Sequence, residues 1–68
     1  MSVAKVTEII SSSSVSFDDA VKKGIKRASK TLKGITGAWV SEQKLTIVDG
    51  KIDQYRVAMR LTFVLEDK

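Results

Sequence analysis

The chain has 68 residues, a net charge of +4 from 12 basic and 8 acidic side chains, and neither Cys nor His. A domain of this size buries only about 60% of the surface that its unfolded chain exposes, so its core leaves a thin margin of stability. The missing Cys and His exclude disulfides, the common transition-metal ligands and the Ser-His-Asp and Cys-His catalytic centres. Oligomerisation is the remaining way to supplement a small core. We therefore expect a single domain over residues 1–68 that forms an oligomer and is not an enzyme.

The N-terminal residues are of mixed polarity, and no apolar run is long enough to cross a bilayer. This pattern predicts a soluble, cytoplasmic protein with no membrane partner. The pI near 9.6 is compatible with anionic partners, from nucleotides to nucleic acid. Charge alone does not choose among them.

The first predicted element is a strand from Val3 to Ile10, where β-branched residues are mixed with polar ones. A serine run follows over residues 11–14, and serine side chains compete for backbone hydrogen bonds. The sequence therefore predicts a short strand and then a loop.

A helix is predicted next, because Ser16 and the acids Asp18 and Asp19 have the spacing of a capping box at a helix start. Gly34 is the expected left-handed residue after its end. We predict a helix from about Phe17 to Lys33. Its apolar stripe recurs every three or four residues and consists of Phe17, Ala20, Val21, Ile25, Ala28 and Leu32.

Two strands follow, joined by Asp49-Gly50, which is a strong signal for a two-residue hairpin turn. In the first of them, ending at Val48, we place Val40 on one face. The opposite face should carry Trp39, Leu45 and Ile47.

The last strand shows the cleanest period of two in the chain. One set of alternate residues is apolar and should face the helix: Tyr55, Val57, Met59, Leu61, Phe63 and Leu65. The other set mixes Arg56 and Arg60 with Ala58, Thr62 and Val64. A face that is too apolar for solvent and too polar for a core is typical of a subunit interface or a ligand cavity. A right-handed crossover through the helix would place this last strand between the other two, antiparallel to both.

Two groups of charged residues have a structural and a functional interpretation. Asp18 and Asp19 could act as an acid-base pair, but at a helix start they more often stabilise the helix dipole. Glu42, Asp49 and Asp53 offer oxygen ligands without the spacing of an EF-hand. The helix also carries six basic residues that could contact phosphates, although such runs are usually solvated: Lys22, Lys23, Lys26, Arg27, Lys30 and Lys33.

Nearly the whole chain resembles the dodecin family. The residues that carry the resemblance are Lys5-Val6, Ser12-Ser13 with Ser16-Phe17, Ala20, Ala28-Ser29-Lys30-Thr31-Leu32, Val40-Ser41-Glu42-Gln43, Asp49-Gly50, Tyr55-Arg56-Val57 and Leu61-Thr62-Phe63. The resemblance implies an α+β fold of β-α-β-β order, in which a three-stranded antiparallel sheet partly wraps one helix. It also implies a hollow homododecamer that binds, stores or buffers flavins without catalysis.

Flavin-binding dodecins carry a Trp near the start of the second strand that stacks on the isoalloxazine, and a Gln in the third strand that bonds the flavin edge. The matching positions here are Gly37 and Arg56, and Trp39 follows two residues later on the same strand face. Arg cannot accept the hydrogen bond that an amide accepts. We therefore expect flavin affinity to be weakened or lost.

Two interpretations remain open. Trp39 could stack on a displaced ligand while Arg56 meets a phosphate or ring oxygen, or the shell has lost flavin and binds another anion or ion, or none. The resemblance assigns Glu42 to the acidic position near the ribityl chain, and Gln43 is an adjacent polar candidate. We expect a small-molecule binding or storage protein with flavin (FMN, riboflavin or FAD) as its ligand, through Gly37, Trp39, Glu42, Gln43 and Arg56, with no catalytic or metal-ligating residue. A flavin-free shell is the alternative, and a basic nucleic-acid-binding domain ranks below both.

Overall fold

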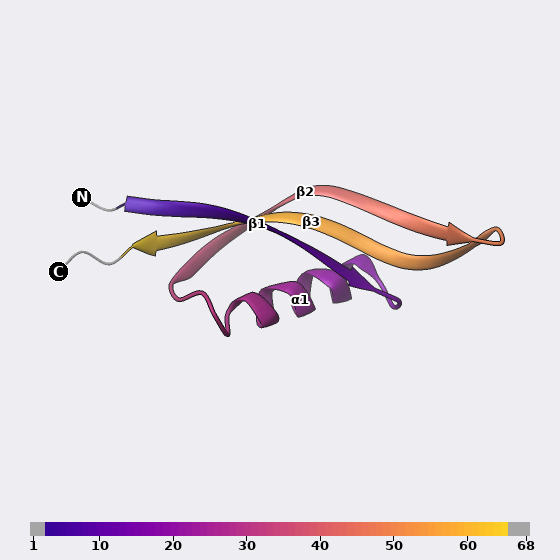
Figure 1. The fold of residues 1–68 in the computed structure, drawn as a ribbon, viewed down its shortest axis with the longest axis horizontal. Coiled ribbons are helices and arrows are strands. Elements are labelled where there is room, and N and C mark those ends of the chain that lie inside the picture. Colours follow the sequence, from indigo (N-terminus) through magenta and orange to yellow (C-terminus); the bar gives the residue numbers. More distant parts are fainter. Residues whose placement is uncertain (1–2, 66–68) are drawn as a thin grey trace.

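The computed structural model describes residues 3–65. In chain order it contains strand β1 (Val3–Ser13), helix α1 (Phe17–Ala28), strand β2 (Ile35–Val48) and strand β3 (Lys51–Leu65). The strands form one antiparallel sheet in the order β1-β3-β2, and α1 lies against one face of it (Figure 1). The predicted β-α-β-β order and the central position of the third strand are confirmed.

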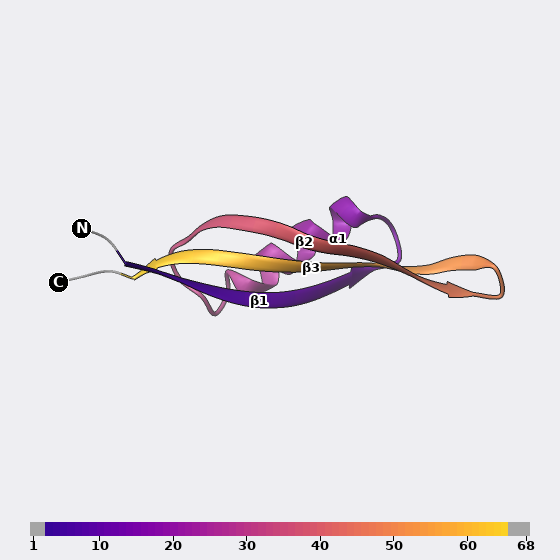
Figure 2. The same cartoon turned by 90° about the horizontal axis from the view of Figure 1, so that it is seen from above.

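The β2–β3 hairpin extends well beyond the helix and β1, and the molecule measures 54 × 19 × 13 Å (Figures 1 and 2). At its tip, Asp49 and Gly50 have φ angles of 52° and 76°, as a type I′ turn requires. Near the tip, Ile47, Val48 and Ile52 are each about half exposed. The hairpin therefore presents apolar surface that its own subunit does not cover.

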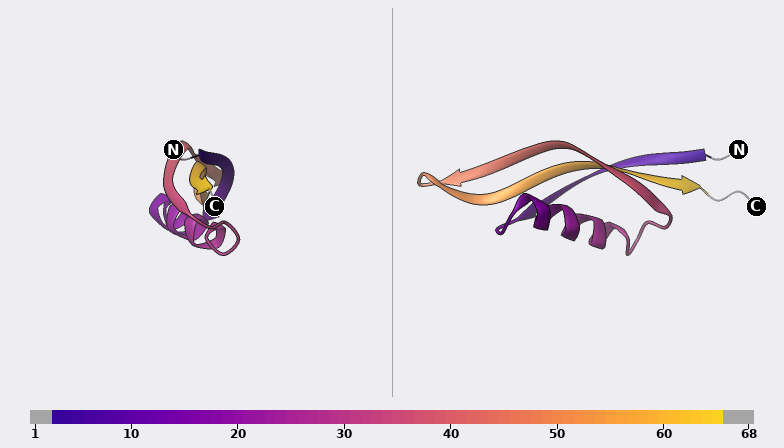
Figure 3. Two further views of the ribbon diagram at one scale, coloured as in Figure 1. Left: turned by 90° about the vertical axis from the view of Figure 1, so that its left-hand side faces the viewer. Right: turned by 180° about the vertical axis from the view of Figure 1, so that it is seen from behind.

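The core lies between the central strand and the helix. Val57, Met59 and Leu61 are fully buried on β3, and they pack against Ala20 and Ala28 of α1. The end view shows the sheet curving over the helix on this side (Figure 3). The predicted alternation of β3 is confirmed for these three residues. Within residues 3–65, no helix has the length and apolar composition needed to span a membrane.

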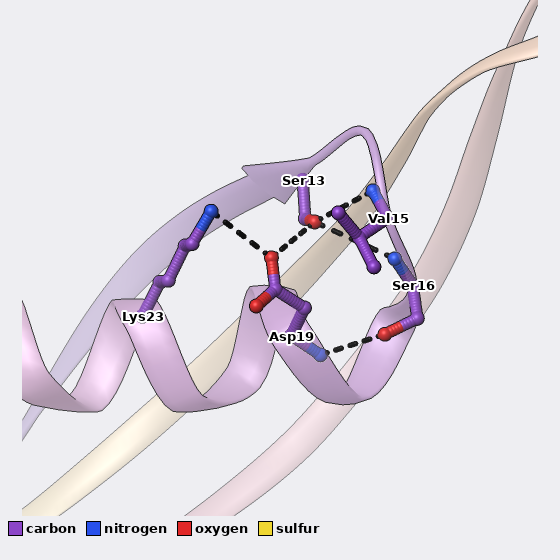
Figure 4. A network of polar contacts seen from close by, with 5 residues as sticks. All are labelled: Ser13, Val15, Ser16, Asp19 and Lys23. Carbon is purple, nitrogen blue, oxygen red and sulfur yellow. Dashed lines mark hydrogen bonds and ion pairs between the residues drawn. The ribbon is translucent and has the colours of Figure 1, made fainter.

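The start of the helix is held by a network of serine side chains (Figure 4). The Ser16 hydroxyl accepts a hydrogen bond of 2.9 Å from the Asp19 amide, as the capping-box spacing predicts. The buried Ser13 hydroxyl donates to the Asp19 carboxylate at 2.5 Å, and Lys23 forms an ion pair of 3.1 Å with the same oxygen. Asp19 thus ties the first turn of α1 to the end of β1.

This network explains why β1 is longer than predicted. The strand continues through Ser11, Ser12 and Ser13, which pair with Val57, Arg56 and Tyr55 of β3. The expectation of a loop from Ser11 onward was wrong, because strand pairing satisfies the backbone of the first three serines. The Ser13 hydroxyl instead caps the turn that follows, accepting from the Val15 amide at 2.9 Å.

The helix is also shorter than predicted, since it ends at Ala28 rather than near Lys33. The Ser29 hydroxyl donates to the Ile25 carbonyl at 2.8 Å, and the next two amides bond three residues back, Lys30 to Arg27 and Thr31 to Ala28. Hydroxyl side chains that take helical carbonyls favour termination of a helix. Leu32 nevertheless packs against the core, as the apolar stripe predicts.

Gly34 adopts the predicted left-handed conformation, with φ of 75°, but for a different purpose. It lies six residues after the helix end and immediately before β2. A Cβ at this position would stand 3.2 Å from the Val64 carbonyl oxygen, and the Gly34 carbonyl accepts from the Val64 amide. The glycine thus allows the chain to turn closely against β3 where the sheet resumes.

A second glycine sets the distance between helix and sheet. Gly24 is buried, and a Cβ there would lie 2.8 Å from Met59 Cε and 2.9 Å from Ser11 Cβ. Real side chains essentially never approach this closely, so the helix would have to move away from the sheet. The small residues of α1 are therefore a packing requirement.

We expect Gly24→Val to destabilise the protein by about 1–3 kcal/mol, because overpacking a closed contact has this cost. Thermal unfolding at a fixed subunit concentration measures the effect. Gly37→Val is the matched control, since a Cβ at Gly37 meets only Thr62 Cβ at 4.0 Å. Equal melting temperatures for the two variants would contradict the tight contact.

The Asp19 network makes the stability of the fold depend on pH in the acid range. The hydrogen bond from Ser13, followed by the contact with Lys23, lowers the pKa of Asp19 below its ordinary value. Ionised Asp19 therefore contributes stability above its unfolded-state pKa of about 3.9, and this contribution is lost as pH falls through the lower folded pKa.

Between pH 5 and pH 2, the melting temperature of the wild type should fall more than that of Asp19→Asn, and the two curves should converge at the acid end. Circular dichroism during thermal unfolding follows both. Asp18→Asn serves as the control, because Asp18 is exposed and lies outside the Ser13 network. Parallel curves for the wild type and Asp19→Asn would show that Asp19 has no such role.

Candidate functional site

The candidate site lies on the sheet face opposite the helix, which we call the outer face. Cross-strand partners in an antiparallel sheet point to the same side, and neighbours along a strand alternate. Since Val57, Met59 and Leu61 face the helix, the intervening β3 residues and their partners face outward. The outer face consists of Val6, Glu8, Ile10 and Ser12 from β1, Arg56, Ala58, Arg60 and Thr62 from β3, and Gly37, Trp39, Glu42 and Lys44 from β2. This confirms that the half-polar set of β3 shares one face.

A β-bulge at Ser41 decides which β2 residues belong to this face. Trp39 pairs with Arg60, and Glu42 pairs with Ala58, so one extra residue lies between them on β2. The Ser41 hydroxyl anchors the bulge by donating to the Ala58 carbonyl at 3.1 Å. Trp39 and Glu42 therefore point to the same side of the sheet, although one has an odd and the other an even number.

The bulge overturns one prediction from the period of two. Trp39 and Leu45 were placed on one strand face, but Leu45 pairs with Tyr55 on the helix side. The placement of Val40 opposite Trp39 is confirmed, because Val40 pairs with Met59 and packs against the core. Its placement opposite Leu45 was wrong, because both lie on the helix side. The side-chain direction along β2 thus changes phase across Ser41, and the pairing with β3 also shifts at Ile35/Gly37 and at Thr46/Ile47.

Trp39 is the one large aromatic residue on the outer face, and 61% of its surface is exposed. The Arg60 guanidinium carbon lies 5.2 Å from the centre of its ring, as a cation-π contact. Arg60 also pairs across the sheet with Glu8 of β1. The cation thus occupies one side of the indole ring and leaves the remainder open.

Arg56 lies two outer-face pairs from Arg60, toward the hairpin, in the pair with Lys44. Its Nε donates to the Ser12 hydroxyl at 3.1 Å, which directs the side chain toward β1. A small hollow of about 50 Å³ lies between the strands. It is lined by the predicted site residues Glu42 and Arg56 together with Ile10, Lys44 and Ala58.

Gly37 also belongs to the outer face, where it pairs with Thr62. Nothing but the Thr62 side chain would approach a Cβ at this position, at 4.0 Å, and its backbone has no positive φ. The fold thus has room for a larger side chain here. The absence of an aromatic ring at residue 37 is therefore a difference in side-chain chemistry only.

Gln43 is the predicted site residue that the structure separates from the others. It pairs with Val57, which faces the helix, so its side chain leaves the sheet on the opposite side from Glu42 and Arg56. Adjacent residues on a strand point to opposite faces unless a bulge intervenes. Within one subunit, the outer face joins Gly37, Trp39, Glu42 and Arg56 without Gln43.

The arrangement offers a flat ring, charged donors and a carboxylate on an open surface. Arg56, Arg60 and Lys44 supply positive charge, and Glu8 and Glu42 supply negative charge. Such a surface can stack a planar ring and bind polar or anionic substituents. Among residues 3–65, no group of three or more acidic, His or Cys side chains gathers where it could hold a metal ion.

The sequence reasoning missed two contributors to this surface. Ser12 was assigned to a loop, and only its strand pairing brings it to Arg56. Lys44 was not singled out, although its register with Arg56 places it beside the hollow. Arg60 was noted as a member of the half-polar set of the last strand. No pattern along the chain showed that it lies against Trp39.

The fold and this face define a small β-α-β-β protein whose open sheet surface is suited to an interface or a planar ligand. The family comparison agrees, since the sequence model of the Dodecin family matches residues 3–66. The chain belongs to the dodecin family.

Solved dodecin structures have the same fold. Dodecin from Streptomyces davaonensis is 33% identical, with a TM-score of 0.92 over 97% of each chain. Dodecin from Streptomyces coelicolor is 31% identical, with a TM-score of 0.92 over 98% of this chain and 96% of the other. A calcium dodecin from Mycobacterium tuberculosis, described as calcium chelating, is 31% identical, with a TM-score of 0.82 over 97% and 94%. No curated protein matches the chain significantly.

The contact between Arg60 and Trp39 can be tested by fluorescence, because Trp39 is the only Trp. A unit charge 5.2 Å from the ring attracts iodide by about 0.8 kcal/mol in water, or roughly fourfold in local concentration at low salt. Arg60→Gln should therefore reduce iodide quenching of Trp39 by up to about fourfold while acrylamide quenching, which is uncharged, changes little. An unchanged ratio of the two quenching constants would contradict the contact.

Proposed function

We propose that the protein binds flavin on the outer face of its sheet and serves as a non-catalytic store or buffer of flavin in the cytoplasm. The observation that carries the proposal is the exposed Trp39 ring on the same face as Glu42 and Arg56. A flavin has a planar ring system, a polyhydroxyl chain and, in FMN and FAD, phosphate. The outer face has a matching group for each part.

Trp39 is the residue to stack on the isoalloxazine, on the side of the indole that Arg60 leaves open. Glu42 can accept hydrogen bonds from the hydroxyls of the ribityl chain. Arg56 and Lys44, which pair with each other across β2 and β3, are placed to meet a phosphate or a ring oxygen. These roles make FMN a better ligand than riboflavin, because FMN carries a phosphate and riboflavin does not.

One subunit cannot enclose such a ligand. The hollow beside Arg56 measures about 50 Å³, whereas pockets for molecules of this size usually measure about 300–1,000 Å³. Apolar residues on the outer face remain exposed as well, with Val6 at 55% and Ile10 at 69%. A second copy that covers this face would bury both the apolar residues and the ring.

We therefore propose that the site is completed by self-assembly, which the family implies, in the form of a hollow homododecamer. The long hairpin supports this view, because its apolar residues near the tip have no cover within the subunit. The five buried apolar residues of the described part of the chain, 3–65, also form a small core for a stable monomer. Assembly thus supplies stability and a closed site together.

A flavin titration followed by fluorescence, with the size of the particle measured by light scattering, tests the proposal. FMN fluorescence should be quenched by the assembled wild type. In Trp39→Ala the dissociation constant should rise by at least about two- to thirteenfold, since stacking is worth about 0.5–1.5 kcal/mol beyond burial. Trp39→Phe should lie between the two.

Gly37→Trp provides the opposite change, because the structure has room for a side chain at this position. A second ring on the same face, two residues from Trp39, should strengthen FMN binding. An assembled wild type that leaves FMN fluorescence unchanged would overturn the proposal in favour of a flavin-free shell. Binding by Gly37→Trp alone would then show that the site was lost by substitution at residue 37.

A further inference from the structure

The positive charge of the chain is concentrated in one segment. Residues 20–41 contain six basic side chains and no acidic one, so their charge is +6. The rest of the chain has 12 − 6 = 6 basic and 8 acidic side chains, which gives −2. The net charge of +4 therefore arises entirely from α1 and the turn that follows it. A charge distributed for solubility alone would not require this separation.

The structure places five of these cations on the solvent side of the helix. Lys22, Lys23, Lys26, Arg27 and Lys30, which we call the cationic face, are all exposed. They span nine residues, or about 12 Å at the rise of an α-helix. Among the described residues, the one ion pair they form is that of Lys23 with Asp19. The other four cations have no acidic partner within residues 3–65.

A groove of about 520 Å³ runs beside the cationic face, between α1 and β1. Lys23 and Arg27 stand on its helix side, and the hydroxyl residues Ser11 and Thr31 also line it. Cationic and hydroxyl side chains are the groups that proteins most often present to phosphate oxygens. The groove thus extends the cationic surface from the helix toward the edge of the sheet.

Neither a second copy of the chain nor a lipid surface matches this surface well. The exposed acids of residues 3–65 are dispersed, with Glu8 on β1, Asp18 at the start of α1, Glu42 on β2, and Asp49 and Asp53 on the hairpin, so these residues offer no acidic patch of similar density. Membrane-surface helices insert an apolar side, but Ala20, Gly24 and Ala28 on the apolar side of α1 are buried against the sheet.

A polyanion with regularly spaced charges matches the cationic face better, because cations that recur every three or four residues can each contact a phosphate. We propose that the cationic face binds the phosphate backbone of duplex nucleic acid without sequence preference. Within residues 3–65, the aromatic residue of α1, Phe17, packs against the core, and Trp39 lies on the opposite side of the sheet, so neither is placed to read bases beside the cationic face. On charge alone, nucleic acid ranked last among the three functions, and the structure adds that these cations share one exposed surface.

Self-assembly, which follows from membership of the family, strengthens this interaction. Each subunit contributes one cationic face, and a long duplex can contact several subunits of one particle. Linked weak contacts raise the overall affinity far above that of a single contact. The proposal does not depend on flavin, because α1 and the outer face lie on opposite sides of the sheet.

Fluorescence anisotropy of a labelled 30-base-pair duplex, titrated with the assembled protein between about 50 and 200 mM salt, tests the proposal. The triple variant Lys22→Gln/Lys26→Gln/Lys30→Gln should bind more weakly. The slope of log K against log salt is negative, and in the triple variant its magnitude should decrease by up to about 2.7, because each lost phosphate contact removes about 0.9. Lys22→Arg/Lys26→Arg/Lys30→Arg keeps the charge and should keep the wild-type slope.

The matched control is Lys5→Gln/Lys51→Gln/Lys68→Gln, which removes three cations outside the cationic face and the candidate site and gives the same net charge, 4 − 3 = +1. This variant should bind the duplex as the wild type does, and light scattering checks that each variant assembles. Equal weakening by the two triple variants would overturn the proposal, since net charge alone would then explain binding. A wild type that fails to bind at 50 mM salt, or that binds phosphatidylserine vesicles but not the duplex, would also overturn it.

Discussion

The rest of the structure depends on one close contact, between the central strand and a helix with small residues on its inner side. Val57, Met59 and Leu61 are covered because Ala20, Gly24 and Ala28 let the helix approach. This contact uses one side of one helix and one side of the sheet. The whole outer face of the sheet and the far half of the hairpin remain without cover. Residues 3–65 contain no further element to place there, and membership of the dodecin family implies self-assembly as the source of cover.

The two sides of the molecule therefore differ in chemistry. The outer face mixes Trp39, apolar side chains and charges of both signs, a combination that suits a planar ligand held between copies. The helix side presents the cationic face, with Asp18 and Asp19 in the first turn of α1, and the sheet separates it from the outer face. One subunit can thus present two independent binding surfaces. The curvature of the sheet over the helix fixes which residues belong to each.

Serine side chains have an unusually large part in defining the elements. Ser13 ends β1 and anchors Asp19, Ser16 begins the helix, and Ser29 ends it. Ser41 holds the bulge, and Ser12 orients Arg56. Hydroxyl groups can both donate and accept, so they satisfy backbone groups at the ends and irregularities of elements. Substitutions at these positions should shift element boundaries before they disturb the core.

The sequence by itself determined the order of the elements, the hairpin turn at Asp49-Gly50, the cap at Ser16 and the buried side of β3, because each depends on residues that are neighbours along the chain. Strand order followed from the crossover rule together with the hairpin. The early end of α1 has a local cause, the Ser29 hydroxyl on the Ile25 carbonyl, which the apolar stripe does not show. The length of β1 and the phase of β2 after Ser41, which puts Glu42 rather than Gln43 on the face of Trp39, were decided only by the tertiary structure. Both depend on β3, a partner strand distant in sequence, which pairs with the serines of β1 and with the residues on each side of the bulge in β2. Such partners leave no periodic signal in the chain that meets them, so the composition of the site could be predicted more fully than its geometry.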